Sequence, residues 1–183
     1  MENIGTTPKV LGLDISTKTI GWALFNIQTQ ELLELTHFSP KVKPKREDKI
    51  EEMLIKSDYF SDKLNDYKNI GVTKVIIEEP LLNSNNIRTV ATLMRYNSFI
   101  TRVIYDILGI VPTYISTYNS RKFAFPDLFK ENIKGRKVLF GGYKVGCDKK
   151  HIIWQKVSHK EPHLTWTYTR NNTLKKENFD MCD

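Results

Sequence analysis

Short runs of apolar residues, separated by polar turn-forming residues, open the chain. The runs cover residues 9–14, 20–27 and 31–38, and the turn formers between them are residues 16–18 and 28–30. Strands joined by such short connections pair with their neighbours in antiparallel fashion. We therefore expect these segments to form an antiparallel meander.

The pattern then changes to a helical period and afterwards alternates between strand and helix. Apolar residues recur at helical spacing over 46–67 and again over 86–108, and Gly109 supplies a stop after the second helix. Residues 73–77 (TKVII) are β-branched and apolar, which is typical of a buried parallel strand. Residues 110–116 predict one more strand.

This order of elements predicts an α/β fold with a mixed five-stranded sheet, three antiparallel strands followed by two parallel ones, flanked by helices. A short helix is expected over 117–125, and glycines then break the pattern over 126–145, which predicts a loop or a small hairpin. Residues 148–158 predict a further helix, and 161–176 an irregular segment. We expect a single domain over 1–183.

The composition is that of a soluble globular protein, with 40% apolar and 27% charged residues. No stretch approaches the roughly 18–20 uninterrupted apolar residues of a membrane span, and no secretory signal opens the sequence. Cys147 and Cys182 are the two cysteines, without a CxxC motif or a Cys/His grid. This argues against a disulfide scaffold or a zinc module and predicts a cytoplasmic protein.

The net charge of +7 is concentrated in one part of the chain. Residues 130–176 contain 12 Lys and Arg against 3 acidic residues, whereas residues 1–129 contain 16 against 15. Aromatic residues such as Trp154 and Trp166 are interleaved with this basic block. Such a composition is typical of a surface that binds nucleic-acid phosphates. A solvated face that merely keeps the protein soluble explains the charge equally well.

Acidic residues stand where buried strands are predicted to end. Asp14 follows VLGL, Glu78 follows KVII, and Asp180 and Asp183 form a D-x-x-D whose members would share one helix face. Each acid alone is explained as a turn or helix-start residue. Together, carboxylates without cysteine ligands suit Mg²⁺ or Mn²⁺, and two such ions can promote phosphodiester hydrolysis.

Four motifs, in order, resemble the RuvC-type Holliday junction resolvases of the RNase H-like (retroviral integrase) nuclease superfamily. They are LGLDISTKTIGWALF around Asp14, VIIEEP around Glu78, the lysine-bearing DKKHIIWQKV, and the closing D-x-x-D. The predicted elements agree with that family over nearly the whole chain. The resemblance favours a divergent phage or viral member, acting in bacterial or infected-cell cytoplasm.

The resemblance implies a magnesium-dependent, structure-selective endonuclease that resolves four-way DNA junctions. Its metal-site carboxylates would be Asp14, Glu78, Asp180 and Asp183, holding two Mg²⁺ ions, for which Mn²⁺ can substitute. One ion would activate water and the other would stabilise the leaving 3′ oxygen. Glu78 is a better match than Glu79, because it directly follows the β-branched run and strand alternation turns its neighbour away.

A lysine near the scissile phosphate is also implied, and Lys149 or Lys150 occupies the matching region. Which of them does so is open, and a solvated lysine at a helix start explains either one. The family acts as a homodimer, because paired nicks require two active sites related by a dyad. The helix over 86–108 is the candidate dimer element, with core packing as its alternative.

The chain departs from the family in two places. The basic insertion at about 126–176 is longer than we expect for bacterial RuvC and suits an accessory DNA-binding element. The family has a further helix after the D-x-x-D, so we expect the C-terminal helix to be truncated here or the fold to close in another way. Two other functions stay open: a nuclease for other branched DNA, flaps or RNA–DNA hybrid, and a catalytically inactive junction-binding module.

Overall fold

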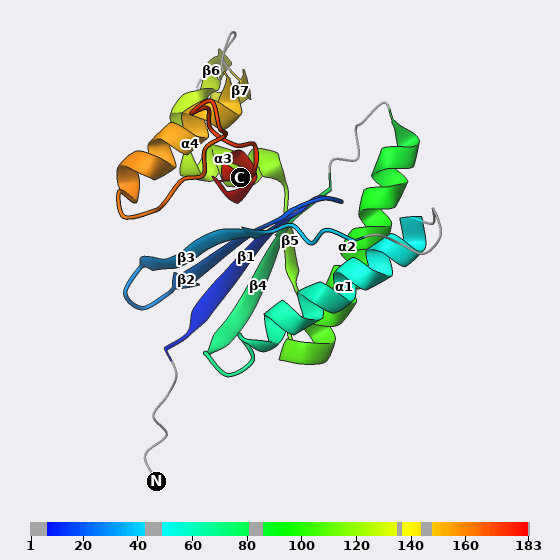
Figure 1. The fold of residues 1–183 in the computed structure, drawn as a ribbon. Helices are drawn as coiled ribbons and strands as arrows, with labels where there is room; N and C mark the ends of the chain where they lie inside the picture. The colour runs from blue at the N-terminus through cyan, green and yellow to red at the C-terminus, as the bar shows by residue number, and fades with distance from the viewer. Residues whose placement is uncertain (1–6, 43–48, 81–85, 135–136, 144–147, 183) are drawn as a thin grey trace.

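The computed structural model describes residues 7–42, 49–80, 86–134, 137–143 and 148–182. In chain order the elements are β1 (Lys9–Ile15), β2 (Ile20–Asn26), β3 (Glu31–Phe38), α1 (Lys49–Asn65), β4 (Val72–Glu78), α2 (Ile87–Leu108), β5 (Thr113–Ile115), α3 (Thr117–Ala124), η1 (Pro126–Leu128), β6 (Phe129–Lys134), β7 (Lys137–Tyr143), α4 (Lys149–Lys160) and α5 (Glu177–Cys182). Helices α1 and α2 lie against one face of the main sheet, and the elements from α3 onward lie on its other side (Figure 1).

The main sheet has five strands in the order β3-β2-β1-β4-β5. Strands β1, β2 and β3 pair antiparallel, and β4 and β5 continue the sheet in parallel with β1. The predicted mixed sheet is therefore confirmed. The last strand is shorter than the predicted 110–116, because Pro112 has no N–H for ladder pairing and the strand begins at Thr113.

The face toward α1 and α2 carries most of the core. Alternate residues of strands β1, β2 and β4 point to this face and are buried. The buried set is Leu11, Leu13, Ile15, Ile20, Trp22, Leu24, Val75 and Ile77 from the strands, with Met53, Phe60, Leu64, Tyr67, Tyr96, Ile100 and Ile104 from the helical side. Full burial of one such side chain stabilises the fold by about 1.5–3 kcal/mol.

Helix α2 begins and ends at the residues expected from the sequence. The Asn86 side chain accepts a hydrogen bond from the Thr89 N–H at 3.1 Å, which satisfies a donor of the first turn. At the other end, Gly109 adopts a left-handed conformation with φ of 68° and donates its N–H to the Tyr105 carbonyl. A residue with a side chain is disfavoured in that conformation, so the glycine fixes where the helix stops.

A smaller apolar cluster holds the later elements together. It is centred on Leu128, Phe129 and Ile153, and so joins η1 and β6 to α4. Residues 126–145 were predicted as a loop or small hairpin, and β6 and β7 form an antiparallel hairpin there. Among the described residues, no helix is long and apolar enough to cross a membrane.

Candidate active site

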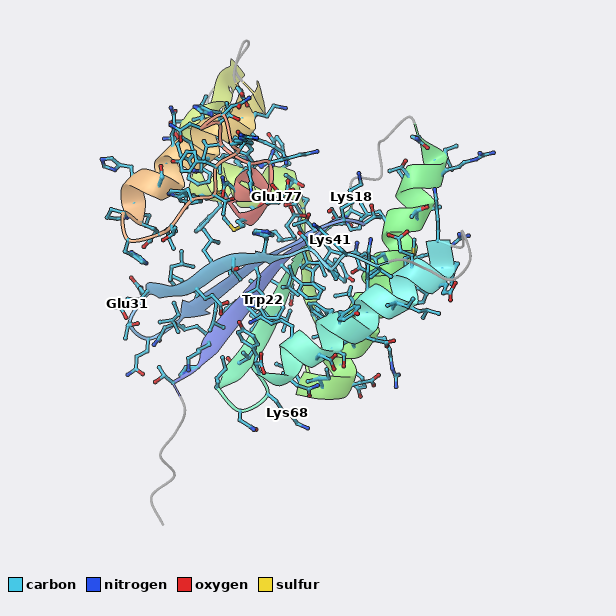
Figure 2. The ribbon with its side chains drawn as sticks, in the orientation of Figure 1. Lys18, Trp22, Glu31, Lys41, Lys68 and Glu177 are labelled. Carbon is cyan, nitrogen blue, oxygen red and sulfur yellow. The ribbon has the colours of Figure 1, made fainter. Side chains whose placement is uncertain are left out.

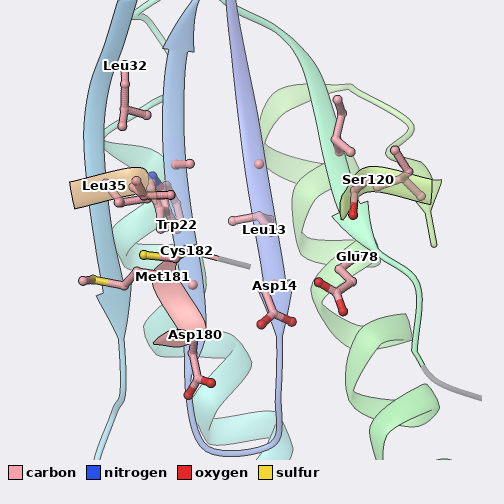
Figure 3. Close-up of a pocket in the computed structure, with 16 residues that line it drawn as sticks. Leu13, Asp14, Trp22, Leu32, Leu35, Glu78, Ser120, Asp180, Met181 and Cys182 are labelled. Atoms are coloured by element: carbon pink, nitrogen blue, oxygen red, sulfur yellow. The ribbon is translucent and has the colours of Figure 1, made fainter. Parts of the chain in front are cut away.

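A cavity of about 390 Å³ lies between the second face of the main sheet and helices α4 and α5. Three carboxylate residues, Asp14, Glu78 and Asp180, line it together (Figure 3). Apolar side chains such as Leu32 and Leu35 line another part of the wall. The structure thus brings together three acidic residues that are far apart in the sequence.

Strand geometry places the first two carboxylates. Strands β1 and β4 are parallel, with Leu13 opposite Ile77, so Asp14 and Glu78 follow at the same edge of the sheet. Leu13 and Ile77 are buried in the core, and alternation therefore turns the next residue of each strand to the opposite face. Glu79 is exposed and does not line the cavity. Of the two neighbouring glutamates, Glu78 is therefore the one at the cavity.

Glu78 is held by Thr117, a residue that no sequence motif marks. The Thr117 hydroxyl donates a hydrogen bond to Glu78 Oε1, and Thr117 is itself largely buried. Thr117 is the first residue of α3, directly after the Ser116 cap. Strand β5 pairs in parallel with β4, which carries this threonine to the end of the neighbouring strand. The one sequence signal for Thr117 is its position just after a predicted strand, where it would lie at the same sheet edge as Glu78.

Asp180 reaches the cavity because α5 lies directly on β2. Gly21 pairs with Asp14 in the sheet, and a Cβ built on this glycine would clash with the Asp180 carbonyl oxygen. The same Cβ would lie 3.1 Å from the carbonyl carbon of Asp180 and 3.5 Å from the Asp14 Cβ. Only a glycine allows the helix backbone to come this close, so Gly21 positions Asp180 beside Asp14.

The short α5 helix is also held from its other side. Asn178 is fully buried, and its Oδ1 accepts hydrogen bonds from the N–H and the hydroxyl of Thr167, both at 3.0 Å. Its side-chain amide donates to the Thr167 carbonyl at 2.6 Å. The His151 ring of α4 lies 6.2 Å from the Phe179 ring. Buried polar groups with all partners in place fix geometry well, so these contacts hold the helix that carries Asp180.

The two candidate lysines differ in their surroundings. The Lys150 ammonium lies 3.0 Å from Asp180 Oδ1, with 44% of the lysine side chain and 17% of the aspartate side chain exposed. Lys149 is exposed at the first position of α4. Lys150 thus pairs with one of the predicted carboxylates, Asp180. The fourth predicted carboxylate, Asp183, lies outside the described residues.

The donor chemistry of the cavity suits a hard divalent cation, because Asp14, Glu78 and Asp180 offer carboxylate oxygens. Within the described part of the chain, no group of three acidic, histidine or cysteine side chains is already close enough to hold one ion. Asp180 is instead paired with Lys150. The carboxylate oxygens of these residues are nevertheless the type of ligand that Mg²⁺ prefers.

Comparison with known proteins supports the fold. No family model matches the sequence, and no curated protein matches it either. A solved structure of Thermus thermophilus RuvC is similar, with a TM-score of 0.55 and 10% identity over 95% of this chain and 89% of that one. RuvC from the same organism in complex with Holliday junction substrate has a TM-score of 0.50 and 10% identity, over 62% and 68% of the two chains. The RNase H-like fold is therefore confirmed.

Proposed function

We propose that this protein is a magnesium-dependent, structure-selective endonuclease that resolves four-way DNA junctions by paired phosphodiester hydrolysis. One observation carries the proposal: the cavity at the carboxyl ends of β1 and β4 gathers Asp14, Glu78 and Asp180. The similar RuvC fold, solved elsewhere with a Holliday junction, supports branched DNA as the substrate. The motifs that resemble RuvC-type resolvases surround these same carboxylates.

In this proposal Asp14 and Glu78, on the strands, and Asp180, on α5, hold the metal, with Asp183 as a further ligand. Bound Mg²⁺ would supply an activated water and stabilise the leaving 3′ oxygen, which leaves 5′-phosphate and 3′-hydroxyl ends. The strands keep two carboxylates at a fixed separation. Thr117 orients Glu78 through its hydrogen bond, and Gly21 keeps Asp180 within reach of the other two.

Lys150 has the role of balancing charge at the substrate phosphate. It lies at the cavity's acidic side and is half-exposed, so it can meet a phosphate while staying near Asp180. The test is a matched pair of variants, Lys150→Met and Lys149→Met, which remove the same charge from neighbouring positions. We expect nicking to fall about 10–100-fold for the first, as for loss of a supporting contact at a metal site, and to change little for the second. Equal losses would contradict the assignment.

The function is tested by nicking of a synthetic four-way junction in Mg²⁺, with Asp14→Asn and a linear duplex as controls. Symmetric cleavage of the junction alone, abolished by the substitution while junction binding persists, is the expected result. Preferred cleavage of flaps or RNA–DNA hybrid would indicate that the protein is an RNase H-like nuclease with a substrate other than the four-way junction. Tight junction binding without cleavage in Mg²⁺ or Mn²⁺ would instead indicate a binding module.

Paired nicks require a homodimer, and α2 is its proposed contact element. One side of the helix packs in the core through Tyr96, Ile100 and Ile104, while Met94 and Tyr105 are about half exposed. An apolar surface of this kind is available to a second copy. We expect light scattering to give the mass of a dimer at micromolar concentration. A strict monomer, with and without junction DNA, would argue against this part of the proposal.

A further inference from the structure

A second cavity, of about 640 Å³, adjoins the candidate active site and shares Asp180 with it. Its wall comes from four segments: the β1–β2 turn, the residues after β3, helix α1, and α5 with the residue just before it. Each of these segments contributes a lysine, namely Lys18, Lys41, Lys56 and Lys176. Figure 2 shows Lys18, Lys41 and Glu177 near one another at this end of the sheet. We call this cavity the lysine pocket.

The backbone around the lysine pocket is fixed before any ligand binds. Ser16 Oγ accepts hydrogen bonds from the N–H groups of Thr19 at 3.0 Å and Lys18 at 3.3 Å, which closes the β1–β2 turn. The Lys56 ammonium is buried and donates to the Thr17 carbonyl at 2.8 Å, so the turn is also tied to α1. The pocket therefore presents Lys18 from a rigid turn, which lowers the ordering cost of binding there.

The charges of the pocket leave an excess of cations. Among the acidic residues of the wall, Glu52 is paired with Lys56 and Asp180 with Lys150. Lys18, Lys41 and Lys176 are exposed, and within the described part of the chain no ion pair engages them. Glu177 is the remaining acid of the wall, so three lysines face one carboxylate.

We infer that the lysine pocket binds a backbone phosphate of the nucleic-acid strand that the active site cuts, next to the scissile phosphate. The inference rests on the proposed function, because the shared residue Asp180 makes the pocket continuous with the carboxylates. A strand whose scissile phosphate meets Asp14 and Asp180 continues past Asp180 toward Lys18, Lys41 and Lys176. Exposed lysines act on phosphates as mobile point charges, and such contacts fix the register of the strand without reading its sequence.

The test compares two double variants in an Asp14→Asn background, so that binding is measured without cleavage. Lys18→Gln/Lys41→Gln removes two charges from the pocket. Lys68→Gln/Lys74→Gln removes two exposed charges away from the pocket: Lys68 lies near the opposite end of the sheet (Figure 2), and Lys74 pairs with Val10 near the start of β1. Junction binding is measured by fluorescence anisotropy over a series of salt concentrations. For the pocket variant we expect the slope of log K against log salt to become shallower by about 0.9, the value for one lost phosphate contact, and the control variant should change it much less.

A second measurement asks whether the contact is with the strand itself. Neutral methylphosphonates replace single phosphates on either side of the cleavage position. The background chain and the control variant should lose affinity at one flanking position, whereas the pocket variant should be insensitive there. Equal slopes and the same methylphosphonate pattern in both double variants would overturn the inference. So would binding of inorganic phosphate that depends on the pocket lysines without any sensitive position in the strand.

The phosphate contact and the proposed nuclease activity can be overturned independently of each other. A chain that nicks the junction in Mg²⁺ but shows no pocket-dependent slope overturns the phosphate contact and leaves the nuclease in place. A chain whose binding depends on Lys18 and Lys41 but which cuts no substrate overturns the catalysis and leaves the contact in place.

Discussion

The two faces of the main sheet are built from the same strands but differ in what closes them. Toward α1 and α2, large side chains such as Phe60, Ile100 and Ile104 are fully buried. Toward α5, Gly21 leaves room for a helix backbone, and a cavity with three acidic residues remains. The first face is covered by apolar packing. On the second face, α5 is held by the close approach of its backbone to Gly21 and by the hydrogen bonds between Asn178 and Thr167. Adjacent residues of one strand therefore point in turn to the apolar core and to the candidate site.

The sharpest test of this separation is a pair of neighbouring glutamates at the end of β4. Glu78→Gln keeps the shape of the side chain but removes a proposed metal ligand, and Glu79→Gln makes the same change on an exposed neighbour. Loss of an outer partner of a metal site costs about 10–100-fold, so loss of a ligand should reduce nicking by about 10³-fold or more. We expect Glu79→Gln to nick normally and both variants to melt near the wild-type temperature. Inactivation by Glu79→Gln would reverse the assignment.

On the face toward α1 and α2, a substitution is expected to reduce stability and to leave nicking unchanged. Phe60 is fully buried beside Trp22, with ring centroids 5.7 Å apart, whereas Tyr59 next to it is half-exposed. Phe60→Ala should lower the free energy of unfolding by about 3–5 kcal/mol through lost burial and a cavity. Tyr59→Ala should lower it far less. Urea denaturation measures both, and nicking by the folded fraction of Phe60→Ala should stay close to wild type. A specific loss of activity in that fraction would show that the two faces are coupled.

The same contrast explains which features could be predicted from the sequence. Asp14 and Glu78 each come at the end of a run of buried residues, and two parallel strands bring their ends together, so the pattern alone predicts that these two carboxylates lie at one edge of the sheet. Asp180 was identified from its motif, but the contact that places it joins β2 to the other end of the chain. In the sequence, Asn178 is indistinguishable from an exposed polar residue. Only the folded structure shows that it is buried and hydrogen-bonded to Thr167. Such contacts depend on how α5 docks, which no local pattern encodes.

Gly21→Ala tests the close approach directly. The added Cβ would clash with the Asp180 carbonyl oxygen and displace α5 from β2. A misplacement of about 1 Å at a reacting centre can cost about 10²-fold in rate, and overpacking costs about 1–3 kcal/mol of stability. Gly12→Ala is the matched control on the same face, since its Cβ would meet Ala23 at an ordinary 3.8 Å. Normal nicking by Gly21→Ala would show that Asp180 is not needed at its present position.

The smallest expected effect comes from the single hydrogen bond between Thr117 and Glu78. Thr117→Val keeps the β-branched shape but removes the hydroxyl, so Glu78 stays in place without the donor that orients it. We expect about tenfold slower nicking, at the low end of the loss for an outer partner of a metal site, together with a higher Mg²⁺ concentration for half-maximal rate. Thr117→Ser restores the donor and should recover most of both. If Thr117→Val and Thr117→Ser nicked at the same reduced rate, the loss would come from altered packing at the start of α3 and not from the missing hydrogen bond. A shift in the Mg²⁺ requirement that serine alone reverses would instead tie Thr117 to the carboxylate, and would make α3 part of the face that performs the chemistry.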